Sequence, residues 1–260
     1  MADYFKAVNL YKHYETNEGT LDVLGGIDLY VKPQEFVCIM GNSGCGKSTL
    51  IRILEGVEKP DDGLVTLGKE ILSSSPSKAR QKKFGIVYQS DNLLEWLSVY
   101  KNVELPLSTF KMKDGKEKDK EKIMDVLTTV GLENFSDCLP RELSGGMRQR
   151  CAIARALVTE PDILMLDQPF GALDAITRKM LNYELLKIQN HMKKTCVMIT
   201  NSVNEALLLG QRILIMSNSP AKIVKEIKVP FTYEERMNQL SLNKTYLEMR
   251  KELNDIVRNL

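Results

Sequence analysis

Residues 35–49 carry the strongest structural signal in this chain and read Glu35-Phe36-Val37-Cys38-Ile39-Met40-Gly41-Asn42-Ser43-Gly44-Cys45-Gly46-Lys47-Ser48-Thr49. The apolar run at 36–40 is typical of a short buried strand, and the residues from Lys47 onward are typical of the start of a helix. Glycines at the spacing G-x4-G-K-S let the backbone fold around phosphate groups, so that N–H groups and the helix N-terminus face negative charge. The stretch therefore predicts a strand, a phosphate-binding loop and a helix in direct succession.

The end of this loop carries two polar side chains with distinct expected roles. Lys47 is expected to reach the β- and γ-phosphates of a nucleoside triphosphate, and the Ser48 hydroxyl is expected to bind magnesium. The expected cofactors are accordingly ATP and Mg2+. The backbone of the neighbouring residues is expected to complete the cofactor site, which also comprises Gly41, Asn42, Ser43, Gly44, Cys45, Gly46 and Thr49.

Two further apolar runs, Ile163–Leu166 and Val197–Thr200, also read as short buried strands followed by helix-like sequence. Strands that alternate with helices predict an α/β fold with a parallel sheet. The first run ends in Asp167, whose carboxylate would lie at the carboxyl edge of that sheet and could hold the magnesium ion. The chain is thus expected to have a P-loop NTPase core.

The middle and the end of the chain read differently from this core. Residues from about 91 to 159 have a helical pattern, with Ile123, Leu127 and Val130 on one apolar stripe, so we expect a helical subdomain inserted into the core. Beyond Ser219 the sequence predicts a short tail of one or two charged amphipathic helices. The expected domains are therefore an ATPase domain at 1–218, including the helical subdomain, and a helical tail at 219–260.

Composition narrows the classes of function that remain. Among 260 residues, 36 are Lys or Arg and 34 are Asp or Glu, which gives no broad field for nucleic acid. No apolar run approaches the roughly 20 residues that would span a bilayer, and the N-terminus has no signal-peptide pattern. Five scattered cysteines without CxxC pairs are expected to be free thiols. The chain is expected to work in the cytosol and to reach a membrane only through a protein partner.

A motif between the two nucleotide motifs identifies the family, and it reads Leu143-Ser144-Gly145-Gly146-Met147-Arg148-Gln149-Arg150. With this motif the sequence resembles the ABC ATPase family over nearly all of residues 3–218. The resemblance implies a head-to-tail dimer in which Ser144, Gly145 and Gly146 act in trans, closing with their helix N-terminus on the γ-phosphate of the partner's ATP.

Other landmarks of the family follow in order along the chain. Gln89 matches the glutamine that senses magnesium and couples to the membrane subunit, and Asp174 ends the loop that contacts the partner ATPase. Tyr14 lies roughly where an aromatic side chain stacks on adenine, although its spacing to the phosphate loop is a few residues long. An ordinary surface or packing role for Tyr14 remains an alternative.

Within the family, residues 93–99, Asn102-Val103 and Met147 are similar to the importer branch for nitrate, sulfonates, taurine and bicarbonate. The resemblance implies an ATP-binding subunit that couples ATP hydrolysis to solute uptake. It would lie peripherally on the cytoplasmic face of the cell membrane. Its partners would be transmembrane permease subunits, a second ABC ATPase and, indirectly, an extracytoplasmic substrate-binding protein. Trp96 would help to form the groove for a permease helix, with simple core packing as the alternative.

Two positions depart from the family pattern and concern the chemical step. Gln168 follows Asp167 where the family has the glutamate that polarises the attacking water, and an amide cannot accept that proton. Asn201 stands where the family has a histidine that contacts the γ-phosphate and the water. The sequence leaves open whether Gln168 is natural or an introduced change. Both departures predict that this chain's own site is impaired in hydrolysis.

The intact trans-acting motif and the two departures together favour a heterodimer with a competent ATPase over a homodimer. The alternative function is a non-hydrolytic regulatory subunit that binds ATP. A DNA-repair or translation protein of the same family would carry a long coiled-coil insert or a second ATPase domain, and neither is present in these 260 residues.

Overall fold

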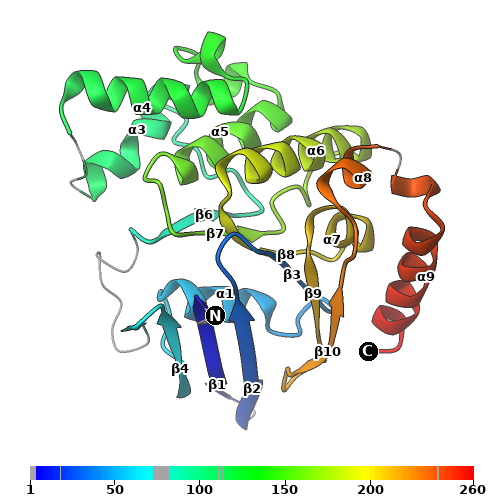
Figure 1. Ribbon diagram of the computed structural model, residues 1–260. Helices are drawn as coiled ribbons and strands as arrows, with labels where there is room; N and C mark the ends of the chain where they lie inside the picture. Colours follow the sequence, from blue (N-terminus) through cyan, green and yellow to red (C-terminus); the bar gives the residue numbers. More distant parts are fainter. Residues whose placement is uncertain (1–3, 18, 73–81, 111, 113, 239) are drawn as a thin grey trace. The chain divides into compact units, whose positions relative to one another are not determined.

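The computed structural model describes residues 4–17, 19–72, 82–110, 112, 114–238 and 240–260, so small parts of the predicted 1–218 domain lie outside the described residues. The chain divides into two compact units, which are described separately (Figure 1). The first unit comprises residues 1–81 and 194–260, and the second unit comprises residues 82–193. The domain boundaries expected from the sequence, 1–218 and 219–260, remain a prediction.

The first unit contains a parallel set of strands around β3 (Phe36–Met40). Strand β3 pairs in parallel with β8 (Thr195–Ile199) on one side and with β9 (Arg212–Met216) on the other. Every residue of β3 and β8 is buried, which fits their continuous apolar composition. Helix α1 (Lys47–Glu55) follows β3, and helix α7 (Val203–Leu209) follows β8. The predicted succession of strand, glycine loop and helix is confirmed.

The first unit also contains an antiparallel sheet that the expectation of a parallel sheet did not include. Its strand order is β2 (Gly19–Val31), β1 (Phe5–Thr16), β4 (Asp62–Leu67) and β5 (Glu70–Ile71). Register shifts interrupt the pairing of β1 with both neighbours, which breaks the regular alternation by which a sequence reveals a half-buried strand. At the shift, a methyl group at Gly63 would lie 2.3 Å from the carbonyl oxygen of Asn9, so this close approach of two backbones requires glycine.

The second unit combines two parallel strands with helices, and three of these helices lie within the range 91–159 that was expected to be helical. Strand β6 (Phe84–Val87) pairs in parallel with β7 (Ile163–Asp167). Between them in sequence come α3 (Val99–Thr109), α4 (Lys116–Thr129), two short 3-10 turns at Glu133–Phe135 and Pro140–Glu142, and α5 (Gly145–Leu157). Helix α6 (Ala175–Met192) follows β7. The predicted apolar stripe is buried, with Ile123, Leu127 and Val130 at most 4% exposed.

The backbones of β6 and α5 approach each other closely at Gly85. A methyl group at this position would lie 2.4 Å from the carbonyl oxygen of Ala156, near the C-terminus of α5. Only a residue without Cβ can occupy this point, since a distance below 3.0 Å forces the backbone to shift. Strand and helix therefore touch main chain to main chain.

The end of the chain returns to the first unit. Strand β10 (Ile223–Lys228) pairs antiparallel with β9, so the predicted helical tail begins with a strand. Helices α8 (Tyr233–Met237) and α9 (Lys244–Arg258) occupy the range predicted as one or two helices, with a 3-10 turn at Leu240–Leu242 between them. Helix α9 buries Tyr246 and Leu253 and packs against α7. No helix in the described part of the chain has the length and apolar character that a membrane span needs.

Candidate functional site

The glycine loop between β3 and α1 has the backbone conformation that phosphate binding needs. Gly44 and Gly46 have φ values of 80° and 103°, which residues with a side chain rarely adopt. A methyl group at Gly46 would also lie 2.9 Å from Cγ1 of Val23, so this glycine is required for space as well. The loop thereby delivers the chain into the first turn of α1, whose N–H groups have no partner within the helix.

The Lys47 side chain is buried within its own loop. Its ammonium group donates hydrogen bonds to the carbonyl oxygens of Gly41, at 2.8 Å, and Asn42, at 2.6 Å, and the residue is 5% exposed. The Cys45 sulfur lies 3.8 Å from the same nitrogen. Ser43 and Ser48 are exposed, and Thr49 is half-buried on α1. A cationic group held by the backbone of a glycine-rich loop fits a phosphate chain, and the Ser48 hydroxyl oxygen is a type of ligand that Mg2+ accepts.

Tyr14 lies on β1 and is held by a carboxylate. Its hydroxyl donates a hydrogen bond of 2.6 Å to Glu58, and the Lys12 ammonium lies 5.2 Å from the centre of its ring. Partial burial, together with the Glu58 contact, raises the pKa of Tyr14 above its usual value. The ring is therefore neutral near physiological pH and fixed in orientation, as a stacking platform should be. The stacking role itself stays a prediction.

Asn201 lies between two anchored neighbours at the end of β8. The Thr200 hydroxyl donates a 2.5 Å hydrogen bond to the Glu205 carboxylate and accepts one of 3.0 Å from the Ser202 backbone N–H. Ser202 caps α7 by accepting a hydrogen bond from the Glu205 backbone N–H. The side chain of Asn201 is exposed, and its two neighbours, Thr200 and Ser202, are held in place by these hydrogen bonds.

In the second unit, Asp167 ends β7 and Gln168 follows it with φ of 47°, a left-handed conformation that is uncommon outside glycine. Gln89 lies close to the same turn, because a methyl group at Gly171 would lie 3.4 Å from the Gln89 amide nitrogen and 3.3 Å from the Gln168 carbonyl oxygen. The structure thus brings together Gln89, Asp167 and Gln168. Carboxylate and amide oxygens of this kind are suitable ligands for Mg2+ when a nucleotide supplies the phosphate oxygens.

The predicted trans-acting residues gather at the N-termini of α5 and α6. Ser144 is the N-cap of α5, where its side-chain oxygen accepts a hydrogen bond from the Met147 backbone N–H at 3.3 Å. Its O–H remains a donor for a phosphate oxygen. Gly146 lies against α6, since a methyl group there would come within 2.9 Å of Cγ2 of Thr177. Both helices therefore begin side by side.

Asp174 caps α6 and is the last of the predicted trans-acting residues. Its carboxylate accepts hydrogen bonds from the Ile176 and Thr177 backbone N–H groups at 3.0 and 3.1 Å. Hydrogen bonding with Thr177, together with that of Ile176, lowers the pKa of Asp174 below its usual value. The group therefore carries its negative charge at neutral pH.

The predicted site residues fall in both units. Tyr14, residues 41–49 and Asn201 belong to the first unit, whereas Gln89, residues 144–146, Asp167, Gln168 and Asp174 belong to the second. Their assignment to ATP and magnesium stays a prediction.

Trp96 is 74% exposed, so core packing does not explain it. The loop that carries it is held by the fully buried Asn102, whose amide donates to the carbonyl oxygens of Leu94, Leu97 and Ser98 at 2.9–3.1 Å. The Asn102 carbonyl oxygen accepts a further bond from the Leu94 N–H at 2.8 Å. The indole is therefore displayed by a rigid turn.

Two arginines of α5 contact the same loop, and the sequence analysis gave them no role. Arg148 pairs with Asp91 at 3.1 Å, and Arg155 donates hydrogen bonds to the carbonyl oxygens of Asp91 and Asn92 at 2.6 and 2.7 Å. Burial lowers the pKa of Arg155 below its usual value. Arg148 and Arg155 are seven residues apart on one helix, a spacing that places both on the same helix face. This spacing is the sequence signal from which a shared contact could have been predicted. The helix that begins with Ser144 thus fixes the loop of Trp96.

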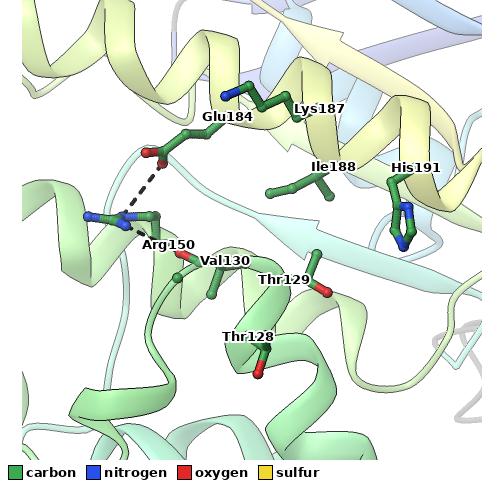
Figure 2. Close-up of a pocket in the computed structure, with 9 residues that line it drawn as sticks. Thr128, Thr129, Val130, Arg150, Glu184, Lys187, Ile188 and His191 are labelled. Atoms are coloured by element: carbon green, nitrogen blue, oxygen red, sulfur yellow. Dashed lines mark hydrogen bonds and ion pairs between the residues drawn. The ribbon is translucent and has the colours of Figure 1, made fainter.

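A cavity of about 410 Å3 lies between the end of α4, α5 and α6, and none of the predicted site residues lines it (Figure 2). At one end Arg150 donates to the Val130 carbonyl oxygen at 3.3 Å and approaches the Glu184 carboxylate at 3.6 Å. Ile188 and His191 of α6 line its other end. Arg150 therefore connects three helices at this point of the second unit.

Comparison with known proteins agrees with the motif pattern. Residues 24–171 match the ABC transporter family. The chain is 40% identical to the bicarbonate transport ATP-binding protein CmpD of Synechococcus elongatus, over 96% of this chain and 89% of that protein. It is 39% identical to the aliphatic sulfonates import ATP-binding protein SsuB of Bacillus cereus, over 93% of this chain and 91% of that protein.

Solved structures give the same answer for the fold. The dimeric structure of MJ0796, a bacterial ABC transporter cassette, is 35% identical, covers 88% of this chain and 100% of that chain, and has a TM-score of 0.76. A dimeric post-hydrolysis state of the same cassette, bound to ADP and Pi, is 34% identical with a TM-score of 0.75. The chain therefore has the fold of an ABC ATPase and belongs to the ABC transporter family, within which it is similar to the ATP-binding subunits of bicarbonate, sulfonate, taurine and nitrate importers.

Proposed function

We propose that this chain binds MgATP as the peripheral subunit of a solute importer, on the cytoplasmic face of the membrane, but hydrolyses the ATP at its own site slowly. Lys47 and Ser48 bind the phosphates and the magnesium ion, Asp167 and Gln89 bind the same ion, and Tyr14 stacks on adenine. The rigid display of Trp96 supports a role of this side chain in contacting a transmembrane permease subunit.

The observation that carries the slow hydrolysis is Gln168, directly after the aspartate that ends β7. An amide has no basic lone pair that could take the proton of the attacking water. Loss of a general base typically slows a reaction by about a hundredfold to ten-thousandfold. Asn201 supports the same conclusion, because its amide can hydrogen-bond to a γ-phosphate or a water but cannot carry a proton.

The residues that serve a partner's ATP support a division of labour between two subunits. Ser144 keeps a free O–H donor at the N-terminus of α5, and Asp174 keeps its charge at the N-terminus of α6. We therefore favour a heterodimer in which a second ATPase, with glutamate and histidine at the two positions, hydrolyses ATP against this chain's Ser144. An extracytoplasmic binding protein would deliver the solute to the permease.

A second candidate is a regulatory subunit that binds ATP and never hydrolyses it, which the same two residues, Gln168 and Asn201, support. In both cases ATP binding closes the dimer. The two candidates differ in whether the site built on Lys47 turns over at all during transport.

Single-turnover hydrolysis in the assembled complex tests the proposal, with the partner's phosphate-loop lysine replaced so that only this chain's site is occupied. Gln168→Glu should raise the rate by about two to four orders of magnitude if it is the only limiting residue. If Asn201 also limits the rate, the combination Gln168→Glu with Asn201→His is needed, because groups that act as a unit are not additive. An unmodified chain that already matches the double variant would refute slow hydrolysis.

The two candidates are separated by the single-turnover assay, in which measurable ADP formation at this chain's site supports slow hydrolysis and its complete absence supports the regulatory subunit. Steady-state transport tests what both candidates share, namely ATP binding at this site. Removing the partner's phosphate-loop lysine abolishes uptake in both cases, whereas Lys47→Ala lowers uptake strongly only if ATP binding at this chain's site is part of every cycle. Uptake that persists unchanged in Lys47→Ala would contradict both candidates.

A further inference from the structure

Arg236 is a buried cation that binds the end of a neighbouring helix. The residue lies on α8 and is 3% exposed. Its guanidinium donates hydrogen bonds to the carbonyl oxygens of Leu207, Leu208 and Gly210, at 3.3, 2.5 and 2.7 Å. These are the last carbonyls of α7 and its C-cap, which have no partner within the helix. One tail side chain therefore closes the C-terminal end of α7.

The charge of Arg236 is retained at this site. Burial lowers its pKa to about 10, which leaves the guanidinium protonated near neutral pH. The carbonyl oxygens at a helix C-terminus carry partial negative charge and favour a cation there. A fourth bond, from Nε to the Phe231 carbonyl oxygen at 3.0 Å, fixes the planar group to the tail itself. The contact is thus both electrostatic and geometrically defined.

A second tail residue contacts α7 at its other end. The Tyr246 hydroxyl on α9 donates a 3.0 Å hydrogen bond to the side-chain oxygen of Asn204, in the first turn of α7. Tyr246 is 6% exposed, and its ring centre lies 6.2 Å from that of Phe231. The tail therefore contacts α7 at both termini, through Arg236 and through Tyr246.

Helix α7 begins two residues after Asn201, with Ser202 as its N-cap. The first turn of α7 carries Glu205, which accepts the hydrogen bond of Thr200 and whose N–H is capped by Ser202. The turn at 200–202 is consequently connected to the tail by hydrogen bonds. Thr200 and Ser202 bond to Glu205 in the first turn of α7, and the end of α7 bonds to Arg236 of the tail. All of these residues belong to the first unit.

From this arrangement we infer that Arg236 and Tyr246 are positioning residues for Asn201. The tail sets where the turn at 200–202 lies and hence how Asn201 meets the γ-phosphate of bound ATP. This inference rests on the role of Asn201 in the proposed function, but it does not depend on the rate of hydrolysis. Arg236 and Tyr246 are not expected to contact ATP themselves, and their effect passes through α7.

A four-variant cycle tests the inference, comprising the full-length unmodified chain, Tyr246→Phe, Asn201→Ala and the combination, each assembled with its partner and permease. The measured quantity is the MgATP concentration that half-closes the ATPase dimer, together with the affinity for MgADP. Tyr246→Phe removes one O–H and should raise the MgATP concentration about threefold to tenfold in the unmodified chain, because residues in one network are coupled. In the Asn201→Ala background it should change this concentration by less than about twofold.

ADP distinguishes positioning from general damage to the fold. ADP has no γ-phosphate, so its affinity should be the same in the unmodified chain and in Tyr246→Phe, whereas a structural defect would weaken both nucleotides. The matched control is Tyr233→Phe, a tail tyrosine on α8 outside these contacts, which should leave both values unchanged. Arg236→Met, compared with Arg258→Met on α9, extends the test if the variant folds.

Two results would overturn the inference: an equal effect of Tyr246→Phe with and without the Asn201 side chain, or no effect of Tyr246→Phe on MgATP-dependent closure. Neither result bears on slow hydrolysis, which is judged from single-turnover rates alone. Fast hydrolysis at the site of the unmodified chain would refute the proposed slow hydrolysis. The four-variant cycle would remain valid, since it compares only the MgATP concentrations that half-close the dimer.

Discussion

The Tyr14 hydroxyl donates a 2.6 Å hydrogen bond to the Glu58 carboxylate. This contact fixes the ring edge, and because the Lys12 ammonium lies over one face of the ring, stacking would use the opposite face. Tyr14→Ala should lower ATP affinity about tenfold, the range that aromatic stacking on a base provides, while Tyr14→Phe should keep most of the affinity. Equilibrium binding of a fluorescent ATP analogue measures both. Tyr30→Ala, which removes an exposed tyrosine from β2, is the control; equal losses in Tyr14→Ala and Tyr30→Ala would contradict a stacking role.

The Lys47 ammonium, held by the carbonyl oxygens of Gly41 and Asn42, is the main positive charge of the phosphate loop. Lys47→Ala and Ser48→Ala should each abolish ATP-dependent dimer closure, because each removes a direct phosphate or magnesium contact. Closure can be followed by light scattering of the purified ATPase pair. Lys59→Ala, an exposed lysine nearby, should close normally. Unchanged nucleotide affinity in Lys47→Ala would refute the site assignment.

Cys45 provides a chemical probe of the same loop. Its thiol is 2% exposed and lies 3.8 Å from the Lys47 nitrogen, so MgATP should slow its alkylation further by covering the loop. Cys138 is the half-buried competitor and is best removed as Cys138→Ser. Burial raises the pKa of Cys151 to about 12, and it likewise raises the pKa of Cys38 and Cys196, which keeps these thiols unreactive. Equal labelling of Cys45 with and without MgATP would count against its predicted position.

Asp61 gives a stability prediction that depends on pH. Partial burial works against its charged form, but hydrogen bonds from the His13 backbone N–H and the Lys12 ammonium dominate and lower the pKa of Asp61 below its usual 3.8. The unfolded chain then binds more protons in the acid range. The stabilisation is therefore present above pH 3.8 and is lost as the pH falls through the folded value. Urea unfolding between about pH 3 and pH 7 should show a flatter acid limb in Asp61→Asn. An unchanged limb would contradict this pairing.

The strands around the phosphate loop could be predicted because each is buried along its whole length and is therefore a continuous apolar run in the sequence. Residues 36–40 were predicted as a strand and form β3. The prediction Val197–Thr200 is shifted from β8 at Thr195–Ile199, and Thr200, just beyond the strand, donates its hydroxyl to the Glu205 carboxylate. Strand β10 was missed since its Val-Lys-Glu-Ile-Lys sequence is exposed and pairs only with β9. Edge strands of this kind have no apolar run to reveal them.

The order of the motifs allowed the candidate site residues to be predicted, but it did not predict the residues that hold them in place. Arg236 occurs in the sequence Glu-Glu-Arg-Met, which resembles an exposed helical turn, and its carbonyl partners on α7 lie 26 to 29 residues away. Likewise Glu58 is 44 residues from Tyr14. Such contacts depend on the tertiary fold, so the hydrophobic periodicity within a single helix or strand cannot predict them.

The main-chain contact between Gly85 and Ala156 has a mechanical consequence. At Gly85 no side chain separates β6 from α5, and a second connection, from the Gln149 side chain to the Tyr88 carbonyl oxygen at 3.2 Å, holds the two elements together about two helical turns nearer the start of α5. A displacement that reaches Gln89, two residues beyond the end of β6, is therefore transmitted to α5 and to its N-cap Ser144. Gln89, the proposed magnesium ligand, and Ser144, the residue proposed to contact the partner's nucleotide, are thus connected through one rigid strand–helix contact.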